Sequence, residues 1–119
     1  MSKYVDVYVL PVPKEKLDAY RSFAEGSGKL WREHGALEYV EFIADDVKPG
    51  VHTSFPQAVK LESDETVIVS WIAFASREDR ERINAAVMND PRLAAMNPQA
   101  LPVDGKRMFW GGFTKLFGV

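Results

Sequence analysis

Two carboxylates, Asp6 and Glu41, stand among aromatic and β-branched residues in stretches that alternate with a period of two. The first stretch is Tyr-Val-Asp-Val-Tyr-Val-Leu at residues 4–10, and the second is Ala-Leu-Glu-Tyr-Val-Glu-Phe-Ile-Ala at residues 36–44. Burial among apolar groups raises the pKa of a carboxyl and can create a general acid or base near neutral pH. Asp6 and Glu41 are therefore the candidate catalytic residues.

The pleat of the strands predicts which side chains surround these carboxylates, because successive side chains point to opposite faces. We expect the alternate valines of residues 5–9 to face the helices. The other face, between two packed sheets, would then carry Asp6, Tyr8, Tyr39, Glu41, Ile43 and Trp71. The candidate ligand-binding residues are Tyr8, Tyr39, Trp71, Trp110, Arg107 and His52.

A structural role for the carboxylates is the competing interpretation. Asp6 and Glu41 would then pair with Arg107 or Lys106, or lie in water at the mouth of a barrel. The two interpretations differ in sign: an adjacent cation lowers the pKa of a carboxyl, whereas burial and a neighbouring carboxylate raise it.

The other reactive side chains give no signature of a metal or nucleophile site. His34 lies on the apolar stripe of a predicted helix and His52 in a loop, without the spacing of a metal-binding pair. Ser70 lacks the flanking glycines of a nucleophile elbow, and Gly-Lys-Arg at residues 105–107 is too short a match to a phosphate loop. Since the chain also has no cysteine, thiolate sites are excluded. We expect no cofactor and no metal.

The composition fits one packed domain over residues 1–119, with 46% hydrophobic and 27% charged residues. The formal net charge is -2 and the basic residues are scattered, which argues against a nucleic-acid partner. No apolar stretch has the length of a membrane span or of a signal sequence. We therefore expect no membrane partner and a cytoplasmic location.

Hydrophobic periodicity predicts four strands and two main helices. Strands are expected at residues 4–10, 36–44, 66–74 and 106–116, the last with a bulge or a point of close approach at Gly111-Gly112. The first main helix runs from Pro13 to a terminating Gly35, and the second begins at a capping box formed by Ser76 and Asp79.

Smaller features complete the pattern. The first strand should end at Pro11, where ladder donors are lost, and Gly26-Ser27-Gly28 predicts a kink or close contact in the first helix. Residues 54–61 form either a short helix capped by Ser54, which we favour, or an extended segment. Asp90 before Pro91 predicts a fresh short turn, and the loop at residues 46–56 is a candidate flap.

The resulting order is that of an α+β, ferredoxin-like β-α-β-β-α-β domain, in which an antiparallel four-stranded sheet carries both helices on one face. The first and third strands are largely apolar on both faces. A face exposed to water would carry polar residues, so the second face requires a cover, and a second copy of the chain is the simplest one. We expect a homodimer.

Seven segments along nearly the whole chain form a characteristic series: residues 3–6, 18–21, 35–37, 69–72, 90–92, 104–108 and 111–113. Together they resemble the YbaA-like family of bacterial proteins of unknown function. The resemblance implies a dimeric α/β barrel. That superfamily includes cofactor-independent monooxygenases, muconolactone isomerases, haem-degrading enzymes and proteins without known activity, so the resemblance implies architecture more than chemistry.

The sequence supports three hypotheses of function. The leading one is a small-molecule-binding protein or a cofactor-independent enzyme, monooxygenase-like or isomerase-like, with Asp6 and Glu41 as polar anchors of an aromatic pocket. The second is a structural or stress-related homodimer without chemistry. The third is an interaction module that offers residues 47–56 to a partner. A closed barrel without a cavity would favour the second.

Overall fold

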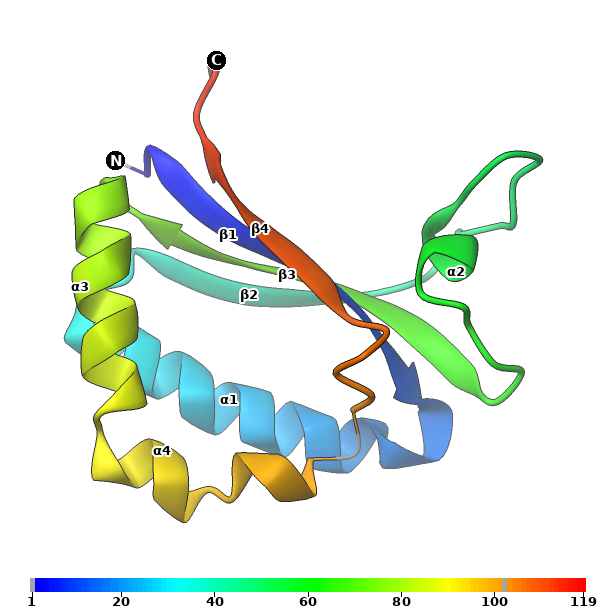
Figure 1. The fold of residues 1–119 in the computed structure, drawn as a ribbon, viewed down its shortest axis with the longest axis horizontal. Coiled ribbons are helices and arrows are strands. Elements are labelled where there is room, and N and C mark those ends of the chain that lie inside the picture. The colour runs from blue at the N-terminus through cyan, green and yellow to red at the C-terminus, as the bar shows by residue number, and fades with distance from the viewer. Residues whose placement is uncertain (1, 102) are drawn as a thin grey trace.

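The computed structural model describes residues 2–101 and 103–119, which form one antiparallel sheet with helices on one of its faces (Figure 1). The strands are β1 (Tyr4–Pro13), β2 (Glu38–Ile43), β3 (Glu65–Phe74) and β4 (Phe109–Thr114). Their order in the sheet is β2-β3-β1-β4. The third strand therefore lies between the first and the second, as the predicted arrangement requires.

Two long helices, α1 (Leu17–His34) and α3 (Arg77–Met88), cover the same face of the sheet. The shorter helices are α2 (Phe55–Ala58) and α4 (Pro91–Ala95), and single 3-10 turns span Lys14–Lys16 and Pro98–Ala100. This order of elements confirms the α+β, ferredoxin-like fold class.

The predicted helix caps are confirmed. Ser54, Ser76 and Asp90 each stand just before a helix, and their side-chain oxygens accept hydrogen bonds from backbone N–H groups of the first turn. The donors are Gln57, Asp79 and Arg92, at 3.2, 3.0 and 2.9 Å. The helical alternative at residues 54–61 is thus the one observed.

The ends of two strands differ from the prediction. β1 continues through Pro11 to Pro13. This is possible because β4 pairs only with residues 4–9 of β1, so the prolines lie where β1 has a single neighbour. β4 begins at Phe109, three residues late, because Asp104 organises a turn: its carbonyl accepts from Arg107 N at 3.1 Å and its carboxylate from Lys106 N at 2.9 Å.

The glycine pairs mark close approaches of side chains rather than breaks. The β1–β4 register runs through Gly111 and Gly112 without a bulge. A Cβ at Gly112 would collide with the Tyr4 hydroxyl. α1 is likewise continuous, and a Cβ at Gly28 would stand only 2.8 Å from the ring of Tyr39. The helix therefore approaches β2 closely at this glycine.

The predicted orientation of the sheet is wrong for β1 and β2. Asp6, Tyr8 and Leu10 face the helices, not a second sheet, and the paired register puts Tyr39, Glu41 and Ile43 on the same side. In residues 5–9 of β1 the valines occupy one parity and Asp6 and Tyr8 the other, so hydrophobicity alone turns the valines toward the helices. Asp6 is tolerated beside the helices because α3 supplies a cation to pair with it.

The outer face of the sheet, turned away from the helices, is apolar and largely uncovered. Its rows are formed by alternate residues of the four strands: Glu38, Val40 and Phe42; Val67, Val69, Trp71 and Ala73; Val5, Val7 and Val9; Phe109, Gly111 and Phe113. The segment between β2 and β3, which carries α2 and which we call the arm, covers only one end of this face, where Val59 packs against Val9 and Val67. Phe42 and Phe113 remain 51% and 58% exposed. We call this surface the outer sheet face.

Candidate functional site

A cleft of about 1050 Å³ lies between α1 and the edge strand β2, on the helix side of the sheet. Its inner wall is apolar, and its rim is formed by charged residues of α1. The lining residues are Leu17, Asp18, Tyr20, Arg21, Ala24, Glu25, Gly28, Lys29, Arg32, Glu33, Tyr39, Val40, Glu41, Phe42, Ile43 and Ile68. The volume suits a molecule of two or three rings.

The residue types on one stripe of α1 create this space. Tyr20, Ala24, Ser27 and Gly28 face the sheet and are buried. Ala24 and Gly28 are too small to fill the gap between helix and strand. Gly28 also lets the ring of Tyr39 lie against the helix backbone. The cleft is therefore walled by the helix, with polar groups near its inner end.

Glu41 is the carboxyl inside the cleft. The Tyr20 hydroxyl donates a hydrogen bond to Glu41 Oε1. The Tyr39 hydroxyl lies 3.1 Å from Ser27 Oγ, which itself donates to the Phe23 carbonyl at 3.0 Å. Among the described residues no cation forms an ion pair with Glu41, so hydroxyl groups alone hold it.

Burial raises the pKa of the Glu41 carboxyl above its ordinary value, although hydrogen bonds from Tyr20 and Tyr39 lower it in part. Burial, followed by the nearby Glu41 carboxylate, also raises the pKa of the Tyr20 hydroxyl. Burial raises the pKa of Tyr39 as well. Both phenols therefore stay protonated as donors, while Glu41 is the carboxyl in the cleft whose pKa burial raises.

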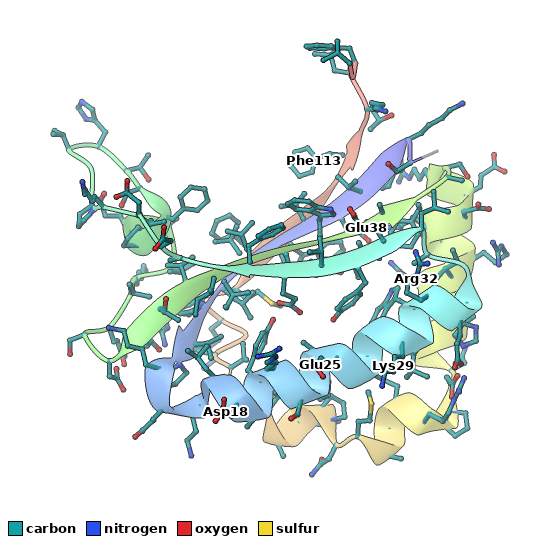
Figure 2. The ribbon with its side chains drawn as sticks, turned by 180° about the vertical axis from the view of Figure 1, so that it is seen from behind. Asp18, Glu25, Lys29, Arg32, Glu38 and Phe113 are labelled. Atoms are coloured by element: carbon teal, nitrogen blue, oxygen red, sulfur yellow. The ribbon has the colours of Figure 1, made fainter. Side chains whose placement is uncertain are left out.

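The rim of the cleft carries both signs of charge along α1, as the labelled residues of this helix in Figure 2 show. Arg21 pairs with Glu25 at 2.9 Å, and Arg32 donates to the Leu37 carbonyl. No ion pair or hydrogen bond to a described side chain engages Lys29. Lys29 is therefore the rim cation available to an anionic group.

Asp6 lies outside this cleft, in a separate network under α3. Its side chain is 0% exposed, and Arg80 donates hydrogen bonds of 2.8 to 3.1 Å to both carboxylate oxygens. Asn84 Nδ2 adds a bond of 3.3 Å, and Asn84 Oδ1 in turn accepts from Trp31 Nε1 at 2.9 Å. Every described partner of Asp6 is a donor, so Asp6 belongs to a structural ion pair and its oxygens are occupied.

Aromatic rings enclose the cation of this pair. The Arg80 guanidinium lies 5.4 Å from the centre of the Tyr4 ring and 5.6 Å from that of Trp110. Trp110 stacks on Tyr8 at 5.8 Å. Burial, then the nearby Asp6 carboxylate, raises the pKa of Tyr8 to about 12. Asp6, Tyr8 and Trp110 are thus brought together as predicted, but apart from Glu41.

The remaining predicted site residues lie in other places. Trp71 is on the outer sheet face, where its Nε1 donates to Glu38 at 2.6 Å. Arg107 pairs with Glu65 and Asp104, not with Asp6 or Glu41. It lowers the pKa of the Glu65 carboxyl.

His52 is exposed on the arm, and no residue of the 46–56 loop is in the described lining of the cleft. Of the predicted set, only Glu41 and Tyr39 line the cleft. Within the described residues, no group of three or more His, Asp or Glu side chains is placed to hold a metal, and no helix is long and apolar enough to cross a membrane.

Sequence reasoning missed Tyr20, Ser27 and Lys29 in the cleft and Arg80 beside Asp6. Tyr20 and Ser27 lie seven residues apart on the buried stripe of α1, a spacing that places both hydroxyls on one line facing the sheet. Arg80 and Asn84 are four apart on α3 in the same way. Polar residues on a buried stripe were the available signal.

The chain is similar to proteins along nearly its whole length. Residues 3–105 match the model of the family described as "Protein of unknown function (DUF1428)". The chain is 46% identical over 114 residues to the uncharacterized protein YbaA of Escherichia coli K12, which covers 96% of this chain and 97% of that protein. YbaA of Shigella flexneri gives the same values.

Solved structures with the same fold are more distant in sequence. A NIPSNAP family protein of unknown function from Agrobacterium tumefaciens aligns with a TM-score of 0.62 at 18% identity, covering 96% of this chain and 88% of that one. A monooxygenase of Streptomyces coelicolor, solved with the ligand nanaomycin D, also gives 0.62 at 18% identity, covering 99% and 91%. These likenesses show the fold shared by monooxygenases and NIPSNAP proteins.

Proposed function

The chain belongs to the DUF1428 family, is similar to YbaA and has the fold of these monooxygenase and NIPSNAP neighbours. We propose that it binds a small aromatic molecule in the α1–β2 cleft and moves a proton on it without a cofactor. The observation that carries this proposal is Glu41: a carboxyl with a raised pKa, held by tyrosine hydroxyls inside a cleft of ligand size. Asp6, occupied by Arg80, takes no part.

The reaction class follows from the groups present. The Glu41 carboxylate removes a proton from a ring CH₂ group that is conjugated with a carbonyl through aromatic carbons, and the electron pair left behind moves through these carbons onto the carbonyl oxygen as an enolate. A tyrosine hydroxyl from Tyr20 or Tyr39 donates a hydrogen bond to that oxygen. Return of the proton to another carbon completes an isomerisation. If dioxygen reacts with the enolate instead, a CH₂ group becomes a carbonyl and one water is released.

The ligand is flat and mostly apolar, with an anionic or hydroxyl group at one end. Its rings lie between Ala24 and Ile68, and its anionic end meets Lys29 at the rim. The monooxygenase neighbour, solved with nanaomycin D, supports a ligand of this general kind. The proposed ligand thus adds a substrate class to the expectation of a monooxygenase-like or isomerase-like protein.

Proton exchange tests the proposal. Anthrone, a tricyclic ketone with an acidic ring CH₂, is incubated with the protein in deuterium oxide without air, and exchange is followed by NMR. Glu41→Gln should slow the catalysed exchange by about 10²- to 10⁴-fold. The matched control is Glu78→Gln, which removes an exposed carboxylate of α3 outside the described lining of the cleft and should leave exchange unchanged. Undiminished exchange in Glu41→Gln would show that Glu41 is not the base.

A second assay locates the bound molecule. The apolar anion 8-anilinonaphthalene-1-sulfonate should bind with a fluorescence increase, and Lys29→Gln should weaken it several-fold. Lys16→Gln removes an exposed lysine outside the cleft and serves as the control. Equal affinities in both variants would place the probe elsewhere.

The alternative, a homodimer without chemistry, is favoured by a different observation, the uncovered outer sheet face. Half-exposed Phe42, Phe109 and Phe113 form part of a continuous apolar surface, and such surfaces mark interfaces. A second copy is also the expected partner of the catalytic form. A dimer that neither exchanges anthrone nor binds the probe would therefore support this alternative.

A further inference from the structure

Two tyrosines at the inner end of the cleft, Tyr20 and Tyr39, both lie beside Glu41. A phenol has one proton and so donates one hydrogen bond at a time, although its oxygen can accept others. The proposed reaction requires one of these two protons for the enolate oxygen of the ligand. The partners of each hydroxyl decide which proton is available.

The proton of Tyr20 is already engaged. The Tyr20 hydroxyl donates to Glu41 Oε1 and so connects α1 with β2 across the cleft. Because no cation among the described residues pairs with Glu41, its ionised form depends on hydroxyl donors. If Tyr20 turned to the ligand, the ionised Glu41 would lose such a donor before it removes a proton. Tyr20 is therefore the group that holds the base.

The proton of Tyr39 has a partner that can exchange roles with it. The Tyr39 hydroxyl lies 3.1 Å from Ser27 Oγ, and Ser27 Oγ also lies 3.0 Å from the Phe23 carbonyl and 3.3 Å from the Ala24 carbonyl. While Ser27 donates to one of these carbonyls, its oxygen accepts the proton of Tyr39. When the Ser27 hydroxyl rotates and donates to the Tyr39 oxygen, the Tyr39 proton is released for another acceptor. No heavy atom has to move.

The ring of Tyr39 is fixed before any ligand enters. One side of the ring lies against the helix backbone at Gly28, and the ring of Trp31 lies 5.7 Å away, centre to centre. Trp31 is itself held by its hydrogen bond to Asn84 at 2.9 Å. Tyr39 and Glu41 are alternate residues of β2, so both project from the same face of the strand. A donor held in this way beside the base suits a charge that develops on the ligand.

Resting on the proposed function, we propose that Tyr39 donates the hydrogen bond to the enolate oxygen of the ligand, and that Ser27 is its positioning residue. Ser27 donates to the Tyr39 oxygen, Tyr39 donates to the ligand, and Tyr20 stays on Glu41. Ser27 is buried and is not in the described lining of the cleft, so it acts only through Tyr39. Burial raises the pKa of Tyr39, but the hydrogen bond from Ser27 lowers it in part and so makes Tyr39 a stronger donor.

The pH dependence of anthrone exchange in deuterium oxide distinguishes the two tyrosines. Tyr39→Phe should lower the catalysed rate about 10²-fold even at the high-pH plateau, where Glu41 is ionised, because one donor to the enolate oxygen is lost. Tyr20→Phe should instead move the rise of the rate to higher pH and keep most of the plateau, because the ionised Glu41 loses a donor. Tyr8→Phe, outside the described lining, is the control and should change neither.

Ser27→Ala tests the positioning role. It keeps the phenol of Tyr39 but removes its partner, so the plateau rate should fall about two- to tenfold, the equivalent of one neutral hydrogen bond. In the Tyr39→Phe background the same substitution should have no further effect, because the hydroxyl through which Ser27 acts is absent. Ser22→Ala, an exposed site on the same helix, is the matched control. Retained binding of 8-anilinonaphthalene-1-sulfonate shows that each variant keeps the cleft.

The outcomes separate this inference from the proposed function. If the parent does not exchange anthrone, or if Glu41→Gln exchanges it equally fast, the proposed function is overturned together with the role of Tyr39. If exchange depends on Glu41 but Tyr20→Phe, rather than Tyr39→Phe, lowers the plateau, only this inference is overturned. An equal effect of Ser27→Ala with and without the Tyr39 hydroxyl would make Ser27 a packing residue of α1 and overturn its positioning role.

Discussion

Replacing Arg80 by Met should destabilise the protein far more than replacing an exposed arginine of the same helix. The variant keeps an apolar stem but leaves the Asp6 carboxylate buried, with only the bond of 3.3 Å from Asn84. Removing one partner of a buried ion pair costs about 3–5 kcal/mol, because the remaining charge is uncompensated. That is about a third of the stability of a typical domain.

Urea unfolding measures this loss. With a slope of about 2 kcal/mol per molar, the midpoint for Arg80→Met should fall by about 1.5–2.5 M. Arg82→Met is the matched control on the same helix, since its partner Asp79 is 3.4 Å away and the pair is exposed. Its effect should stay within about 0.5 kcal/mol.

The double variant Asp6→Leu with Arg80→Met separates the charge from the packing. It removes both charges, so its stability should be much closer to that of the parent than that of Arg80→Met. Some loss remains because the guanidinium also contacts the rings of Tyr4 and Trp110. A double variant as unstable as the sum of the two single variants, or equal effects of Arg80→Met and Arg82→Met, would refute the argument.

Three further predictions concern the cleft and the outer sheet face. Gly28→Ala should lower the free energy of unfolding by about 1–2 kcal/mol relative to Gly26→Ala. The new methyl group at position 28 meets the ring of Tyr39 at 2.8 Å, whereas at position 26 it meets the flexible Met96 sulfur at 3.1 Å. The urea midpoints of the two variants measure this difference. Burial raises the pKa of Glu41, so the stability that its protonated form contributes is present below pH 4.5 and is lost as the pH rises through the raised pKa. Glu41→Gln should therefore be more stable than the parent at pH 8 but not at pH 4. An equal difference in stability at both pH values would contradict the raised pKa. Trp71→Asp should abolish a dimer of twice 13.4 kDa in sedimentation, whereas Trp31→Phe should keep it; equal masses for both would remove Trp71 from the interface.

Local signals in the sequence were sufficient for the elements and their order. Ser54, Ser76 and Asp90 each predict a helix start from one side chain and one backbone N–H, and none of these caps depends on distant parts of the chain. The strands follow from their β-branched runs, and the order of the sheet follows from the α+β arrangement. The length of β1 could not be predicted, because tolerance of Pro11 depends on where β4 ends.

The orientation of the sheet could not be read from the strands, because it is decided by the helices. In residues 5–9 one parity carries three valines and the other carries Asp6 and Tyr8, so hydrophobicity alone turns the valines toward the helices. The polar residues settle it: Asp6 must face α3, which carries Arg80, and Glu41 must face α1, which carries Tyr20. A prediction made strand by strand omits these partners.

The same dependence explains why two carboxylates on one sheet face have different chemistry. α3 gives Asp6 a guanidinium, which binds both of its carboxylate oxygens in an ion pair. α1 gives Glu41 the hydroxyl of Tyr20, which donates a hydrogen bond but brings no positive charge, so burial prevails and the pKa of Glu41 rises. Small residues at Ala24 and Gly28 then leave Glu41 beside open space, whereas Asp6 is absent from the described lining of the cleft. The helix opposite each carboxylate, rather than the strand that carries it, therefore determines that Asp6 lies in an ion pair whereas Glu41 borders the cleft without a cation among the described residues.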